Sequence, residues 1–192
     1  LGTGVITLES GGTLDVNGNV VANAFTANET RGTLTNTGAA ADYSGTNIVN
    51  NGSFTLDGTG NLTLGNIGGS SGAAIVKNGS NTVTLSGTAD NGYLAATVNA
   101  GTLILAKDTG TSSHRAIGGG VIINSGGTVQ LAGDGDQIYD PNSVVINEGT
   151  FDVNTQTETI NSLQIGDGTT NGSVTGTSGV LSVGGGGIAA QS

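Results

Sequence analysis

Short runs of alternating apolar and polar residues recur along the whole chain, separated by Gly, Asn and Ser. In the segment 13–16, Leu14 and Val16 point to one side of an extended strand, while the intervening polar side chains point to the other. The same alternation occurs at 5–8, 62–64, 83–85, 103–105 and 180–183. A helix would lose about 1 kcal/mol at each of the frequent glycines. The pattern therefore predicts an all-β chain of short strands.

The strands belong to a repeated phrase: a β-branched pair, a small polar residue, Gly followed by Thr or Ser, and then two apolar residues around a variable one. It reads IVNNGSFTL at 48–56, TVNAGTLIL at 97–105 and VINEGTFDV at 145–153, and with one extra residue IINSGGTVQL at 122–131. The marker glycine falls at positions 12, 32, 52, 79, 101, 127 and 149, so a repeat is about 23 residues long. A fixed period of this length, with two short strands and a tight turn, is what a β-solenoid requires. We expect one continuous segment over 1–192, made of about eight coils of roughly 20–27 residues.

Structural roles follow for the residues of the repeated phrase. Glycine tolerates the left-handed backbone of a sharp corner, and asparagines at one corner of successive coils, ~4.8 Å apart, can hydrogen-bond into a ladder. Loops that leave the solenoid are expected at 66–72, 108–115 and 167–172, where the spacing lengthens. The corner glycines are Gly52, Gly101, Gly127 and Gly149, and the ladder candidates are Asn50, Asn99 and Asn147. The residues expected to point inward, in two stacked rows, are Leu14, Val16, Phe54, Leu56, Val83, Leu85, Leu103, Leu105, Val129, Leu131, Phe151 and Val153.

Composition supports a narrow core. Gly accounts for 37 of 192 residues, aromatics for 3 %, and Cys, Met and Trp are absent. Such a chain has too few large side chains for a thick core but enough Val, Ile, Leu and Ala for a stacked one. The same composition is found in disordered chains, but the fixed phase of the apolar pairs argues against disorder.

The net charge of −10, with four scattered cations, argues against nucleic acid and anionic membranes as partners; the acidity is read as favouring solubility. No stretch approaches the roughly 18 apolar residues of a membrane span. The chain begins at Leu1 with no basic-then-apolar leader, so we expect a processed or excised part of a longer protein. Neither end carries a helical or charged cap, and we expect both to be covered by more of the same polypeptide or by another subunit.

Two stretches are more specific than a generic solenoid. Residues 76–105 contain VKNG, TVTLSG and TVNAGTL, with Tyr93 at an aromatic turn, and residues 137–163 contain QI, SVVIN, GTFDVN and ETINSL. Together they resemble the passenger-associated (autotransporter-associated) β-strand repeat of type V secretion. The Asn-Thr-Tyr-Thr-Gly turn usual in that family is replaced here by DNGYL at 90–94. The resemblance implies a right-handed parallel β-helix displayed on the surface of a Gram-negative bacterium, through an outer-membrane barrel outside these 192 residues.

Candidate chemistry is sparse. His114 is the only histidine, and its neighbours Ser112 and Ser113 cannot give nucleophile-to-base geometry; we interpret it as a solvated loop residue. Asp134, Asp136 and Asp140 have a spacing weakly suggestive of Ca²⁺, but they break the EF-hand pattern, and turn capping is the default interpretation. The clustered carboxylates and bases of polysaccharide-cleaving β-helices are not apparent. We therefore predict no catalytic residue, no cofactor and no metal.

The leading hypothesis is a non-enzymatic stalk or adhesive scaffold, extracellular or at the cell surface. Its partners would be neighbouring coils, like subunits end to end, or ligands on host or neighbouring cells. A self-assembling extracellular filament, stacked through open coil ends, is the alternative. A polysaccharide-acting enzyme is the third. The repeat bears on architecture and export more than on activity.

Overall fold

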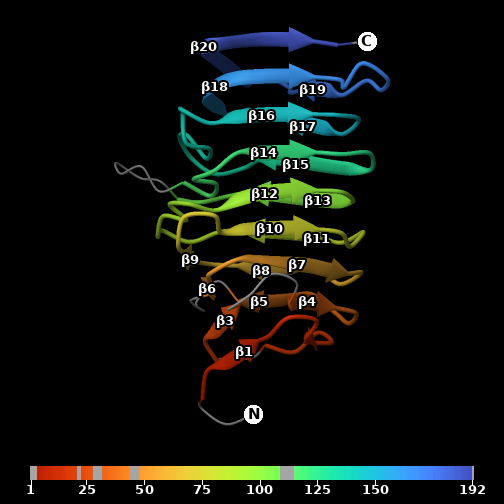
Figure 1. The fold of residues 1–192 in the computed structure, drawn as a ribbon, viewed down its shortest axis with the longest axis vertical. Helices are drawn as coiled ribbons and strands as arrows, with labels where there is room; N and C mark the ends of the chain where they lie inside the picture. The colour runs from red at the N-terminus through yellow and green to blue at the C-terminus, as the bar shows by residue number, and fades with distance from the viewer. Residues whose placement is uncertain (1–3, 21–22, 28–31, 44–47, 109–114, 192) are drawn as a thin grey trace.

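The computed structural model describes residues 4–20, 23–27, 32–43, 48–108 and 115–191. Every regular element in these ranges is a strand, and the strands wind about one axis as a right-handed parallel β-helix of about eight turns. In Figure 1 the coils are stacked from β1 near one end to β20 at the other, so that chain order follows the long axis. The fold class expected from the repeat is confirmed.

Three parallel sheets form the sides of the rod. Sheet 1 runs along the N-terminal half and contains β1 (Ile6–Leu8), β3 (Phe25–Ala27), β6 (Ile48–Asn50) and β9 (Ile67–Gly69). Sheet 2 runs the full length and contains β2 (Thr13–Asp15), β4 (Gly32–Asn36), β7 (Ser53–Gly58), β10 (Ala74–Lys77), β12 (Ala95–Val98), β14 (Val121–Ile123), β16 (Ser143–Ile146), β18 (Thr157–Ile165) and β20 (Val180–Ala190). Sheet 3 contains β5 (Ala41–Tyr43), β8 (Leu62–Leu64), β11 (Thr82–Leu85), β13 (Gly101–Leu105), β15 (Gly127–Leu131), β17 (Thr150–Asp152) and β19 (Ser173–Thr175).

The interior is filled by rows of side chains in register. On sheet 3, Val83, Leu103 and Val129 occupy equivalent positions in successive coils and are fully buried. Because each inward residue packs on its counterparts above and below, the apolar core is narrow and continuous along the rod. The residues expected to point inward are all buried except Leu14, which is half-buried in the first coil.

The expected register is nevertheless wrong in one respect. Gly12, Gly32 and Gly52 mark the corner that leads into sheet 2, whereas Gly79 and the later marker glycines lie at the corner that leads into sheet 3. The inward residues therefore come from two sheets and do not form one pair of rows. The phrase recurs at both corners because each needs the same local chemistry, a small polar turn followed by an alternating strand.

This change of corner also explains a loop that was wrongly expected. The 66–72 segment contains β9, which pairs in parallel with β6. In the true register Phe54 lies opposite Ile75, 21 residues later, so this coil has no insertion. The loop expected at 108–115 falls mostly outside the described residues, and 167–172 is a loop between β18 and β19, as expected.

Sheet 1 ends at β9, and beyond it the third side of the rod is irregular. An isolated bridge joins Ile117 to Ile138 there, and the long strands β18 and β20 restore regular pairing over both the third side and sheet 2.

Exposed apolar side chains mark the two ends of the stack: Val5, Val20, Val174, Val180 and Ile188. In β20, Ile188 pairs with the buried Leu163 of β18 and so continues an interior row. It is nevertheless 64 % exposed, since no strand of the described residues covers it.

Candidate functional site

An asparagine ladder runs along the corner between sheets 2 and 3. The Asn99 side-chain amide donates to Asn78 Oδ1 at 2.8 Å, Asn124 to Asn99 at 2.7 Å, and Asn147 to Asn124 at 2.7 Å. Each amide donates to the coil before and, within the ladder, accepts from the coil after. The structure thus joins Asn99 and Asn147 through Asn124 and extends the ladder to Asn78.

Asn50, the third ladder candidate, lies elsewhere. It ends β6 in sheet 1, is fully buried, and donates to the Ala74 carbonyl at 2.9 Å while accepting from the Gly52 amide at 3.1 Å. Its expected place in the same ladder is wrong because Asn50 and Gly52 belong to the corner entering sheet 2. Asn50 instead satisfies backbone groups inside the rod.

The corner glycines are required for two different reasons. Gly101 has φ +65°, the left-handed conformation expected at a corner. At Gly127 and Gly149 the constraint is the neighbouring coil: a Cβ at Gly127 would lie 2.4 Å from the Val98 carbonyl oxygen, and one at Gly149 2.4 Å from Ile123 Cγ2. The glycines at these positions let successive coils approach closely.

The acidic loop before β16 spreads its carboxylates over different contacts. Asp136 accepts from the Thr159 amide of the next coil at 3.0 Å, and burial together with the Asp140 charge raises its pKa. The Asp134 backbone carbonyl accepts from the Gln137 side chain at 2.8 Å. Within the described ranges no three His, Cys, Asp or Glu side chains gather as a metal-ligand group, so Asp134, Asp136 and Asp140 offer Ca²⁺ no common set of side-chain ligands.

Sequence reasoning missed a set of polar side chains inside the rod. These fully buried residues include Lys77, Asn91, Lys107, Gln137 and Glu158. Strand alternation could have located two of them, because Lys77 shares the parity of Ile75 and Glu158 that of Ile160. Buried polar groups are retained where they satisfy backbone amides and carbonyls that the corners leave without a sheet partner.

One series of these side chains follows the corner that leaves sheet 3. Asn91 Oδ1 accepts from the Ile67 amide at 2.9 Å, and Gln137 Oε1 accepts from the Lys107 amide at 2.8 Å. Glu158 accepts from the amides of Gln137 at 2.9 Å and Ile138 at 3.2 Å. In each case a side chain of a later coil satisfies an earlier corner, so the series links coils in the part of the rod where the third side is irregular.

Glu158 is the most perturbed acid of this series. Burial raises its pKa to about 8, against the lowering effect of the two amide hydrogen bonds. Desolvation prevails because the side chain is fully buried. The carboxyl is therefore largely protonated in the folded chain at neutral pH.

The two buried lysines are perturbed in the opposite direction. Burial lowers the pKa of Lys77 and of Lys107 to about 8, offset in part by the charges of Asp57 and Asp90 respectively. Lys77 Nζ donates to the carbonyls of Gly79 and Ala100, and Lys107 Nζ donates to Gly65 at 3.0 Å. The Lys107 ammonium contacts the coil of β8, and Glu158 lies four coils further along, roughly 19 Å at ~4.8 Å per coil. The buried acid and base therefore do not neutralise each other directly.

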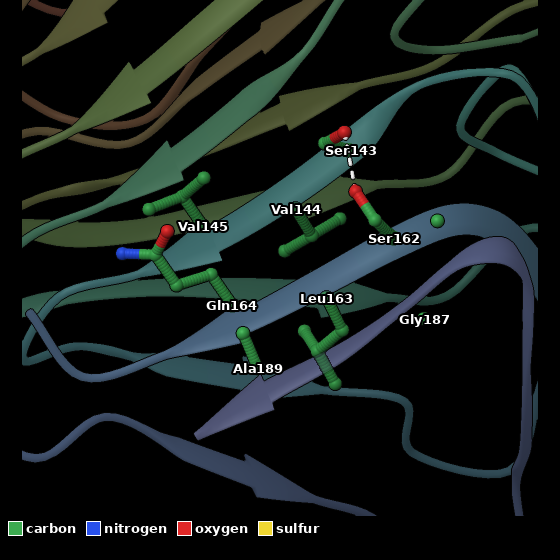
Figure 2. Close-up of a pocket in the computed structure, with 9 residues that line it drawn as sticks. Ser143, Val144, Val145, Ser162, Leu163, Gln164, Gly187 and Ala189 are labelled. Carbon is green, nitrogen blue, oxygen red and sulfur yellow. Dashed lines mark hydrogen bonds between the residues drawn. The ribbon is translucent and has the colours of Figure 1, made fainter. Parts of the chain in front are cut away.

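A shallow cavity of about 230 Å³ lies against β16, β18 and β20 of sheet 2. Figure 2 shows Ser143 and Ser162 joined by a hydrogen bond, which measures 2.6 Å between the hydroxyl oxygens, with Val145 and Gln164 further along the strands. Gly186 and Gly187 leave this part of the surface low. Its lining holds serine hydroxyls, a glutamine amide and aliphatic groups but no ionisable side chain, so it can form hydrogen bonds but has no acid or base for proton transfer.

His114, with Ser112 and Ser113, lies outside the described residues. No helix long and apolar enough to cross a membrane occurs in the described ranges. Comparisons with protein-family models, curated proteins and solved structures each return no match.

Proposed function

We propose that this chain is a non-catalytic segment of a secreted or surface-displayed bacterial passenger protein, serving as a rigid stalk or adhesin scaffold. The observation that carries the proposal is the filled, continuous interior: apolar rows run along the rod, and buried side chains hydrogen-bond from coil to coil. Such a rod keeps its ends apart and presents its outer faces at a fixed spacing. The passenger-repeat motifs at 76–105 and 137–163 support the surface location.

The distribution of ionisable groups supports a non-catalytic role. An active site brings perturbed acids and bases to a surface that a substrate can reach. Here the side chains with a pKa near 8, Lys77, Lys107 and Glu158, are fully buried and hydrogen-bonded to backbone atoms. These groups stabilise corners and are sealed from a polymeric substrate.

Antibody labelling of the source bacterium tests the proposal. Antibodies against the purified chain should label intact cells or the culture medium, and external protease should remove the cell-bound signal. Labelling only after permeabilisation would overturn the proposed location. Release of reducing ends from polygalacturonate by the purified chain would instead favour the polysaccharide-acting enzyme.

Filament assembly is the second candidate, and the exposed apolar residues of the end coils favour it. Val5 and Val20 are 62 % and 64 % exposed in the first coil, and Ile188 is 64 % exposed in the last strand. Burying such residues in a head-to-tail contact would extend both the sheets and the core. Sedimentation velocity over a concentration series distinguishes the candidates, since ordered fibres would favour the filament and a monomer at every concentration would argue against it.

A further inference from the structure

The fold separates the six aromatic residues into two groups. Four are buried, Phe25, Tyr43, Phe54 and Phe151, each at most 2 % exposed. Tyr93 and Tyr139 are 63 % and 40 % exposed. An exposed tyrosine contributes little to the core, and its ring is available for contact with another molecule.

Backbone pairing brings both tyrosines to the irregular third side of the rod. The Asn91 amide donates to the Arg115 carbonyl at 3.0 Å and the Gly119 amide to Leu94 at 2.9 Å, which joins the Tyr93 coil to the next one. The backbone amide of Tyr139 in turn donates to the Ile117 carbonyl at 3.0 Å. The two tyrosines are thus two coils apart on one side, about 10 Å at ~4.8 Å per coil.

The coil between the rings carries no side chain at its three central residues, although the Arg115 side chain of the same coil lies over the Tyr139 ring. It passes the third side as Gly118-Gly119-Gly120. A Cβ at Gly118 would lie 2.1 Å from the Gly92 carbonyl oxygen, and one at Gly119 3.0 Å from Ala95 Cα. A side chain is excluded at Gly118 and would be tightly crowded at Gly119, so the strip between Tyr93 and Tyr139 is bare backbone at these residues.

Arg115 orients one of the two rings. Its guanidinium carbon lies 4.2 Å from the centre of the Tyr139 ring, and its backbone amide donates to Asp90 Oδ1 at 3.1 Å. This cation–π contact restrains the tyrosine without burying it. The coils that carry the two tyrosines also carry carboxylates close to them in sequence: Asp90 and Asp140 are exposed and Asp136 is half-buried.

We propose that Tyr93, the strip 118–120 and Tyr139 form a binding surface for an extended, neutral, β-1,4-linked hexose polymer. Sugar rings present an apolar C–H face that packs on an aromatic ring, and two residues of such an extended chain span a distance close to two coils. The carboxylates accept hydrogen bonds from hydroxyl groups and disfavour an anionic polymer. The inference rests on the adhesin-scaffold role proposed above and names the ligand class of that scaffold.

Calorimetric titration of the purified chain with cellohexaose tests the surface. We expect saturable binding that weakens about tenfold or more in Tyr93→Ala and in Tyr139→Ala, as for aromatic anchors at other interfaces. Tyr93→Phe should retain most of the affinity because it keeps the ring. Ile122→Ala, which removes a 41 % exposed side chain from sheet 2, is the matched control and should bind as the parent chain does.

Three outcomes would overturn the inference: no binding of cellohexaose, unchanged affinity in both alanine variants, or equal affinity for maltohexaose, whose α-1,4 links coil the chain. Tyrosine ring signals in NMR spectra provide a second measurement on the unsubstituted chain, and two of the three tyrosines should shift on titration. The assay uses no cells. A failure here therefore leaves the antibody labelling result, and with it the stalk role, unaffected.

Discussion

Replacing the buried acid Glu158 by Gln should change how stability depends on pH. The folded chain keeps this carboxyl protonated up to a pKa of about 8, whereas in the unfolded chain it ionises near its ordinary pKa of 4.5. Between these values the folded state holds a proton that the unfolded state has released, so stability falls as pH rises through the window. Below pH 4.5 the contribution is fully present, and above pH 8 it is lost.

The gap between the two pKa values corresponds to at most roughly 5 kcal/mol. Glutamine has nearly the same shape as glutamic acid, but the amides of Gln137 and Ile138 donate to different carboxyl oxygens, so glutamine can accept only one of the two hydrogen bonds. We therefore expect Glu158→Gln to be less stable than the parent chain at pH 5 by about 1–3 kcal/mol, because one buried amide loses its acceptor. Between pH 5 and pH 9 the difference in stability should then shift in favour of Glu158→Gln by several kcal/mol, because the variant never carries the buried charge.

Urea unfolding followed by far-UV circular dichroism at pH 5, 7 and 9 measures the effect, from the midpoint and slope at each pH. Glu148→Gln makes the same change at an exposed residue and is the matched control, with a pH dependence parallel to the parent chain. The reasoning is refuted if the parent chain gains stability over Glu158→Gln as pH rises. That result would mean that the two amide hydrogen bonds favour the carboxylate more than burial opposes it.

Three further predictions concern the interior and the ladder. Leu103→Asp should unfold several neighbouring coils together, since an unpaired buried charge costs several kcal/mol, and hydrogen exchange should show lost protection beyond β13; loss confined to β13 would contradict it. Lys107→Met should reduce the rise in stability between pH 8 and 10.5 and leave the share that Lys77 contributes, because each buried lysine has its pKa lowered to about 8 and loses its charge in the folded chain before the unfolded chain does; urea unfolding at pH 8 and pH 10 measures this. Asn124→Ala removes the hydrogen bonds to Asn99 and Asn147 and should cost about 1–3 kcal/mol by urea unfolding, without altering the sheets.

Of the candidate sites, the asparagine ladder could be predicted from the sequence in part, and the tyrosine surface could not. The ladder residues Asn99 and Asn147 were predicted because each occupies the same place in the repeated phrase, and such a repeat is visible in the sequence. The aromatic strip was not found: Tyr93 and Tyr139 lie in unlike local sequences, and only the coil register brings them to one side of the rod. The sequence does not show why Gly118 and Gly119 lack side chains, because the reason is the close approach of Gly92 and Ala95 in the neighbouring coil.

The sequence by itself determined the architecture, because alternation fixes which side chains point inward and the period fixes the coil. It could not assign each phrase to a corner, since the chemistry of a small polar turn before a strand is the same at both. Thus Gly52 and Gly101 look equivalent along the chain but enter different sheets. The buried charges were decided by tertiary structure: whether Glu158 is ionised depends on the amides of the preceding coil and on complete desolvation, and both exist only once the coils have stacked.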